Sequence, residues 1–192
     1  MNPRVNNFVF KGLMTKHAVK DMQLAGLLRS PAATTQERAE HDFYAPVTEV
    51  IRTGSLEMAR NYRLLYVFEN LVRDFINIRF TEEDKITNWF DKRSNTPMKK
   101  KVADRQKGEE KHQWHTGRNE GPLYYLDFSD LGLLIINHWN VFKDFFPKQS
   151  WVTTRIEEAE RSRNVIAHTN LLSSEESQRL EMYLRDWMKQ VG

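Results

Sequence analysis

The sequence of 192 residues contains no cysteine, which excludes disulfide bonds and thiolate metal ligands. This absence is typical of proteins from a reducing compartment. No apolar run approaches the roughly 18 residues that a membrane-spanning helix needs. Residues 1–12 also lack the basic start, the apolar stretch and the small-residue cleavage site of a signal peptide. We therefore expect a cytoplasmic protein with no part in a membrane.

Alternation of apolar and polar residues over strand length is also missing, whereas apolar residues recur at three- and four-residue steps. This spacing predicts an all-α bundle of four or five main helices. We expect residues 46–192 to form this domain and residues 1–45 to be a partly helical N-terminal extension. Within the domain, the main helices are predicted over 53–80, 131–145, 150–168 and 173–191, with a short helix starting at Thr81.

The formal net charge of +3 is concentrated in one segment. Residues 91–120 contain nine Lys or Arg and five Asp or Glu, so this segment carries +4 and the rest of the chain −1. Few core residues interrupt it, which predicts a long basic loop, either an ordinary solvated loop or an RNA-binding surface. In the second case basic side chains would neutralise phosphates and an aromatic ring would stack on a base. The candidates are Lys99, Lys100, Lys101, Arg105, Lys107 and Trp114.

The histidines do not favour a metal site. His112 and His115 are three residues apart in the basic segment, but no cysteine or inward carboxylate accompanies them. We therefore predict neither a metal ion nor another cofactor. His138 lies on the apolar face of the helix predicted over 131–145, so we expect a hydrogen-bonded histidine in the core or at an interface.

Two charged residues fall on helix faces that are predicted to point inward. Arg163 follows Ala159 by four residues, and Glu69 holds an equivalent position on the helix predicted over 53–80. A buried charge without a partner is costly, so an ion pair between Glu69 and Arg163 is one interpretation. A functional site is the other, because Asn164 and His168 share a helix face beside Arg163.

The stretch Arg163-Asn-Val-Ile-Ala-His168 resembles the R-x4-6-H motif of HEPN domains, an all-α superfamily of ribonucleases and nucleic-acid-associated proteins. The stretch YRLLYVFENLVRDFI, residues 62–76, resembles the early HEPN helix with its inward acidic residue. The stretches YLDFSDLGLLIINHWNVFKDFF and RNVIAHTNLLSSEE resemble one subgroup in particular. That subgroup includes the C-terminal domain of a yeast nuclear endoribonuclease of transcript surveillance and bacterial stand-alone proteins.

This resemblance implies a homodimer in which two R-x4-6-H motifs face each other across one cleft. It also implies metal-independent RNA cleavage, in which the 2′-hydroxyl attacks the adjacent phosphorus and leaves a cyclic phosphate and a 5′-hydroxyl. By position, His168 is expected to act as acid or base, and Arg163 to hold the phosphate or its developing charge. Asn164 occupies the polar position after the arginine. Glu69 is expected to orient Arg163 or His168.

The resemblance extends to toxins and phage-defence proteins, so an antitoxin or a defence-system protein is an expected partner. Asn170, however, stands where toxins paired with a nucleotidyltransferase often have tyrosine, and that particular partnership is not supported. Many members of the superfamily are also regarded as non-catalytic. The alternative function is therefore a module that binds RNA or a protein partner through the same cleft and the basic segment. A structural dimerisation domain is the third.

Overall fold

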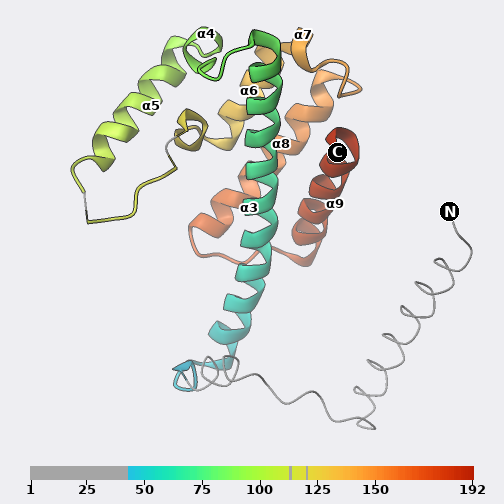
Figure 1. Ribbon diagram of the computed structural model, residues 1–192. Helices are drawn as coiled ribbons and strands as arrows, with labels where there is room; N and C mark the ends of the chain where they lie inside the picture. The colour runs from blue at the N-terminus through green and yellow to red at the C-terminus, as the bar shows by residue number, and fades with distance from the viewer. Residues whose placement is uncertain (1–42, 113, 120) are drawn as a thin grey trace, which may run out of the picture. The chain divides into compact units, whose positions relative to one another are not determined.

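A computed structural model describes residues 43–112, 114–119 and 121–192, and every regular element in these ranges is a helix (Figure 1). The chain divides into two units, residues 1–52 and 53–192, and the second contains the candidate site. The extension predicted over residues 1–45 lies almost wholly outside the described residues, so its boundary stays a prediction. In the described part, none of the helices is both long and apolar enough to cross a membrane.

Five of the described helices have ten residues or more, which confirms the predicted all-α bundle. The longest, α3 (Glu49–Asp84), carries a buried stripe because its apolar residues recur every three or four positions. It runs through Thr81 to Asp84, and the left-handed φ of 58° at Lys85 follows its end, so the short helix predicted to start at Thr81 does not exist. The buried stripe of α3 includes Leu65, Phe68, Val72, Ile76 and Phe80.

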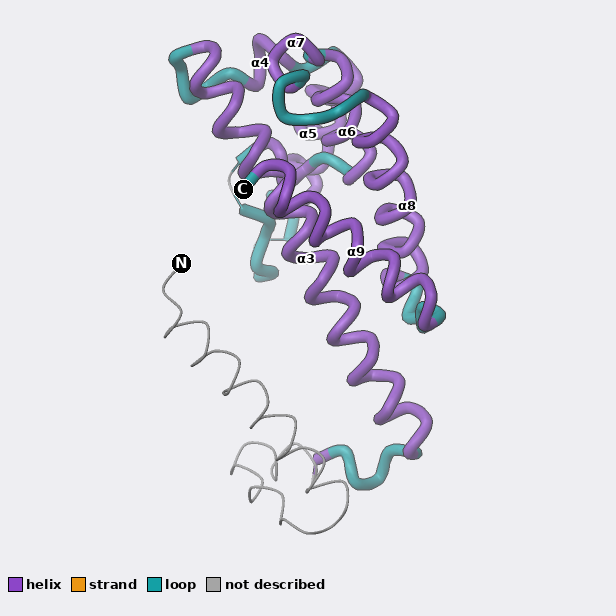
Figure 2. The backbone as a smooth tube through the Cα atoms, turned by 90° about the vertical axis from the view of Figure 1, so that its right-hand side faces the viewer, coloured by secondary structure: helices purple, strands orange, loops and turns teal. Residues whose placement is uncertain are grey.

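The helices α8 (Gln149–Ala167) and α9 (Ser174–Val191) run beside α3 in both views of the backbone (Figures 1 and 2). Helix α6 (Phe128–Asn137) packs closely on α8, and Gly132 permits this because it has no side chain. A Cβ added at Gly132 would lie only 3.3 Å from Cγ2 of Ile156. Trp187 of α9 is fully buried at the centre, in ring contacts that join α3 and α9. A single aromatic core therefore holds the long helices together.

The helix predicted over 131–145 is interrupted. Helix α6 stops at His138, whose backbone leaves the helical region, and the short helix α7 (Trp139–Phe142) follows. The Nε2 atom of His138 lies 2.7 Å from the carbonyl oxygen of Arg93, and its ring packs edge-on against Phe80. The predicted hydrogen bond of this histidine is therefore confirmed, its side chain is partly buried, and the same residue marks the break in the helix.

The basic segment 91–120 is not a long loop, and that prediction is wrong. The short helix α4 (Phe90–Arg93) leads into α5 (Thr96–Glu109), a helix of 14 residues. The side chain of Asn95 caps α5 by accepting a hydrogen bond from the backbone N–H of Met98, at 3.0 Å. Only Met98 and Val102 of α5 are buried, and two apolar residues are too few to reveal a helix by periodicity. The loop itself is limited to the residues between α5 and the 3-10 helix η1 (Pro122–Tyr125).

Candidate functional site

A pocket of about 400 Å³ lies where the middle of α3, the end of α8 and the region leading into η1 meet. Its apolar wall includes Leu65 and Ile166, which are both buried. Its other walls are polar or aromatic, so the pocket is suited to a ligand that combines charge with a flat ring. These residues are Tyr62, Tyr66, Glu69, Asn70, Arg73, Asn119, Tyr124 and Arg163.

Glu69 forms an ion pair with Arg73, one helical turn further along α3. Both side chains are largely buried, at 17% and 11% exposure. The guanidinium of Arg73 also donates to the carbonyl oxygen of Leu123 at 3.2 Å and lies 5.0 Å from the ring centre of Tyr124. Arg73 therefore joins α3 to η1, and its position is fixed by several partners at once.

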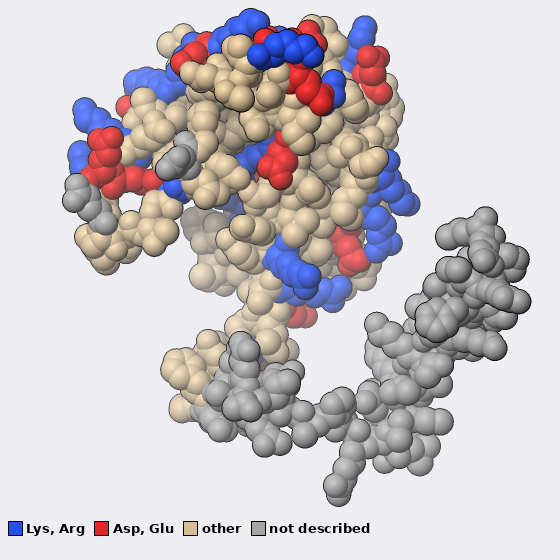
Figure 3. All heavy atoms as spheres, in the orientation of Figure 1, with Lys and Arg blue, Asp and Glu red and all other residues tan. Residues whose placement is uncertain are grey.

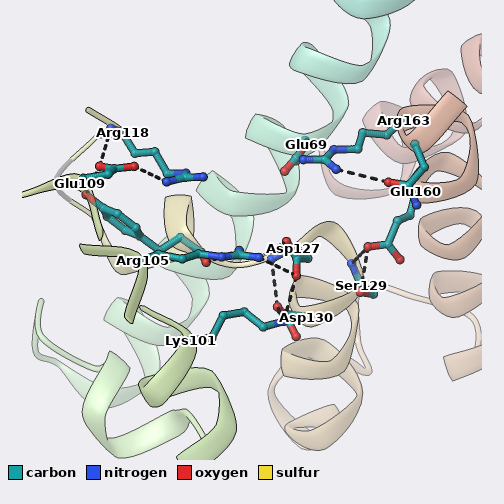
Figure 4. Close-up of polar contacts among 12 residues, drawn as sticks. Glu69, Lys101, Arg105, Glu109, Arg118, Asp127, Ser129, Asp130, Glu160 and Arg163 are labelled. Carbon is teal, nitrogen blue, oxygen red and sulfur yellow. Dashed lines mark hydrogen bonds and ion pairs between the residues drawn. The ribbon is translucent and has the colours of Figure 1, made fainter. Parts of the chain in front are cut away.

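Arg163 forms no ion pair with any carboxylate of the described residues, so the predicted pair between Glu69 and Arg163 is absent. Its side chain extends from α8 toward Glu69 (Figure 4), and within the described residues its one side-chain hydrogen bond, of 3.3 Å, goes to Oδ1 of Asn164. Arg163 is exposed, whereas Ala159 and Ile166 on the same helix are buried. The inward position predicted for Arg163 is therefore wrong, because this turn of α8 faces the open pocket instead of the core.

The charges around the pocket do not cancel. Glu69 contributes one negative charge, and Arg73 and Arg163 each contribute a positive one, so the three side chains carry a net positive charge. Because the carboxylate of Glu69 is already paired with Arg73, the guanidinium N–H donors of Arg163 are not used by it. A guanidinium with free donors at the mouth of a pocket is suited to a phosphate group.

His168 caps the end of α8, and a tight turn follows it. The backbone N–H groups of Thr169 and Asn170 donate to the carbonyl oxygens of Ile166 and Val165, at 2.9 and 3.1 Å. This is the Schellman pattern, and it places Thr169 at a φ of 58°. The backbone of His168 is thereby held, while its exposed imidazole has no hydrogen-bond partner in the described part of the chain.

The pocket lining contains two of the four residues of the predicted catalytic site. Glu69 and Arg163 line the pocket, and His168 follows Ala167, which also lines it. Asn164 lies outside the lining but holds Arg163 from the neighbouring position on α8. The arrangement gives an exposed guanidinium in the pocket lining, and the exposed imidazole of His168 belongs to the residue that follows this lining in the sequence.

Two of the predicted RNA-binding cations form ion pairs with carboxylates of the same chain. Lys101 forms ion pairs with Asp127 and Asp130, and Arg105 donates to Asp127 at 2.8 Å and to the carbonyl oxygen of Tyr125 (Figure 4). Burial lowers the pKa of Lys101, but its hydrogen bonds to the two carboxylates outweigh burial and raise the pKa above its ordinary value. Lys101 and Arg105 therefore attach α5 to the start of α6.

The other predicted RNA-binding residues are more accessible. Lys99 donates to the carbonyl oxygen of Asp91, and Lys100 lies 3.4 Å from a carboxylate oxygen of Asp104. Lys107 is exposed and has no ion pair within the described ranges. The ring of Trp114 is 80% exposed. Figure 3 shows basic side chains gathered over the α5 region with acidic ones among them, so its outer face is not uniformly positive.

The segment between α5 and η1 is tied to Glu109. Its carboxylate accepts a hydrogen bond from the backbone N–H of Arg118 at 3.1 Å and another from the hydroxyl of Tyr125, also at 3.1 Å. The backbone N–H of Arg118 is the main reason why the pKa of Glu109 is lowered. This attachment holds the segment that brings Asn119 to the pocket.

Sequence reasoning did not identify Asn70, Arg73, Asn119 and Tyr124 as site residues. The spacing of four between Glu69 and Arg73 could have indicated their ion pair, since such residues are neighbours on a helix. Asn119 and Tyr124 come from a separate segment, so only the tertiary structure could reveal them. Among the described residues, no group of three or more His, Asp or Glu side chains could hold a metal ion.

A family profile described as Swt1-like HEPN matches residues 63–192, which include all of the pocket except Tyr62. No curated protein and no solved structure matches the chain.

Proposed function

Because the chain belongs to the Swt1-like HEPN family, we propose that it is a metal-independent endoribonuclease that acts as a homodimer. The observation that carries this proposal is the state of Arg163. It is exposed at a pocket with a net positive charge, and it forms no ion pair with a carboxylate of the described residues. An RNA phosphate would complete its hydrogen bonds.

The chemistry requires two proton transfers. The 2′-oxygen bonds to phosphorus and loses its proton, while the bond from phosphorus to the 5′-oxygen breaks and that oxygen gains a proton. In a dimer with facing sites, one copy of His168 accepts the first proton and the other copy donates the second. Arg163 stabilises the charge that develops on the phosphate oxygens. Asn164 holds Arg163, and Glu69 fixes Arg73 beside it.

Exposed apolar side chains support a dimer interface near the motif. Tyr62 and Tyr66 line the pocket and are 60% and 59% exposed, and Leu171, just after the motif, is 50% exposed. Large apolar side chains grouped beside a polar site are typical of surfaces that bind another molecule. A second protomer placed here would also bring the two copies of His168 toward each other.

The test uses end-labelled single-stranded RNA in excess EDTA. Wild-type protein is expected to cleave it to products with a cyclic phosphate, and Arg163→Ala and His168→Ala are expected to lose at least about 100-fold in rate. Arg161→Ala is the matched control, because Arg161 is an exposed arginine on the same helix. Equal cleavage by His168→Ala and wild type would reject the mechanism, and loss of cleavage in EDTA would show that a metal is required. The dimer is tested by light scattering.

One observation favours the alternative, a non-catalytic module that binds RNA or a protein. Glu69 is occupied by Arg73, so no described carboxylate orients the imidazole of His168 in the single chain. If wild type binds the RNA but leaves it intact, the binding module is the better description. The resemblance also suggests a toxin or phage-defence role with a partner protein. Growth arrest on expression of wild type, but not of His168→Ala, would support it.

A further inference from the structure

A second pocket, of about 170 Å³, adjoins the first, and the two share Arg73 and Tyr124 as walls. It lies between the middle of α3, the residues that lead into α4, and η1. Because Arg73 is held by Glu69 and by the carbonyl oxygen of Leu123, the wall between the two pockets is fixed. A ligand that occupies both pockets would therefore pass over Arg73.

The lining of the second pocket is apolar on one side. Trp89, Phe90 and Leu123 all line it and are buried, with exposures of 2%, 7% and 5%. These buried side chains form an apolar floor, and the partly exposed ring of Tyr124 provides a flat surface against which a planar ring can pack. The volume is less than half that of the first pocket, which suits a single ring system better than a whole nucleotide.

The amide of Asn77 is held in one orientation at the edge of this pocket. The indole Nε1 of Trp89 donates to Oδ1 of Asn77 at 2.9 Å. An indole N–H can only donate, so the amide oxygen must face Trp89. The Nδ2 group of Asn77 is therefore left as a hydrogen-bond donor, and Asn77 is exposed to solvent.

Asp74 supplies acceptors one turn before Asn77 on the same face of α3. Its carboxylate is exposed and has no ion pair or hydrogen bond with any side chain in the described part of the chain. The neighbouring Arg73 does not neutralise it, because that guanidinium is bound to Glu69. The pocket thus presents a free carboxylate and a fixed amide donor at neighbouring positions.

We propose that this second pocket binds a guanine base of the RNA, next to the phosphate at Arg163. The Watson–Crick edge of guanine carries two adjacent donors, N1–H and N2–H, which match the two oxygens of Asp74, and one acceptor, O6, which matches Nδ2 of Asn77. Adenine, cytosine and uracil each lack the two adjacent donors. The inference rests on the proposed RNA-cleaving function, and it adds a base preference to that function.

The test measures binding by fluorescence anisotropy. The probes are 2′-O-methyl oligouridylates with one central guanosine, inosine or adenosine, which cannot be cleaved by 2′-hydroxyl attack. We expect the guanosine probe to bind at least about tenfold more tightly than the adenosine probe. Inosine is expected to fall between them, because it lacks the N2 amino group.

Two variants assign the preference to this pocket. Asp74→Asn replaces one acceptor by a donor and is expected to abolish the preference for guanosine. Asn77→Asp keeps the acceptor for Trp89 but removes the free donor, and is expected to reduce the preference. Asp144→Asn is the matched control, because Asp144 is an exposed aspartate on another part of the surface.

The outcomes separate the two proposals. Equal binding of the three probes by wild type, or an unchanged preference in Asp74→Asn, overturns the guanine pocket and leaves the RNA function standing. To cover failure of RNA binding, guanosine 5′-monophosphate is titrated against wild type and Asp74→Asn by calorimetry. Binding that depends on Asp74 without any RNA binding supports the pocket and rejects the RNA function. If the protein binds neither guanosine 5′-monophosphate nor RNA, both the guanine pocket and the RNA function are rejected.

Discussion

The carboxylate of Glu69 is bound by Arg73, one turn along α3, and this ion pair lies inside the pocket that Arg163 lines. Both partners are mostly buried, so the pair belongs to the scaffold of the site. Because Arg73 is the partner of Glu69, the guanidinium of Arg163 remains available to bind an anion. The relationship thus divides the two arginines into one that builds the pocket and one that faces its ligand.

This division predicts different effects on stability. Arg73→Ala should lower the free energy of unfolding by about 1–3 kcal/mol, because it leaves Glu69 and the carbonyl oxygen of Leu123 without their donor. Arg163→Ala should change it by less than about 0.5 kcal/mol, because its side chain is exposed. Urea denaturation followed by circular dichroism measures both. A larger loss in Arg163→Ala than in Arg73→Ala would contradict the assignment.

The turn after His168 predicts a stabilising substitution. Thr169 is β-branched and has a φ of 58°, a conformation that costs a residue with a side chain about 1 kcal/mol. Thr169→Gly should therefore raise the free energy of unfolding by about 0.5 kcal/mol, after the greater freedom of glycine in the unfolded chain is included. Thermal unfolding measures this. Lys85→Gly is the matched comparison, since Lys85 has the same φ without a branched side chain and should gain less.

The basic residues of α5 should fall into two groups, one that stabilises the fold and one that contributes to RNA affinity. Lys101→Met should lower stability by about 1 kcal/mol, because it removes the partner of Asp127 and Asp130. Lys107→Met should leave stability unchanged but reduce the slope of log affinity for RNA against log salt by about 1, if Lys107 contacts a phosphate. Anisotropy titrations over a range of salt concentrations decide this. An unchanged slope would place the RNA path away from Lys107.

Asp84 predicts a pH dependence of stability. Hydrogen bonds from Arg93 and then from Lys92 lower the pKa of this carboxyl well below its ordinary value, in spite of burial. The folded state therefore binds this proton less readily than the unfolded chain, so the stabilisation is complete above the unfolded pKa of about 4 and is lost progressively below it. Asp84→Asn should be less stable than wild type at pH 7. The difference should shrink as the pH falls from 4 to 2, as measured by urea denaturation.

Much of the fold followed from local patterns. The periodicity of α3, α8 and α9 was visible because each helix buries one stripe of apolar residues. Helix α5 was missed because its helical state depends on the Asn95 cap and on ion pairs to α6, not on an apolar stripe. The break at His138 was missed for a similar reason, since its partner is a backbone carbonyl from a distant segment.

The sequence by itself determined the three longest helices, α3, α8 and α9, that Arg163 and His168 stand at the end of α8, and the family to which the chain belongs. These features depend on spacings of a few residues along the chain. Only the tertiary structure decided that Arg163 is exposed and forms no ion pair with Glu69, and that Tyr124 and Asn119 complete the pocket. A charged side chain takes the partner that is nearest in space, and that distance is set by how distant segments pack.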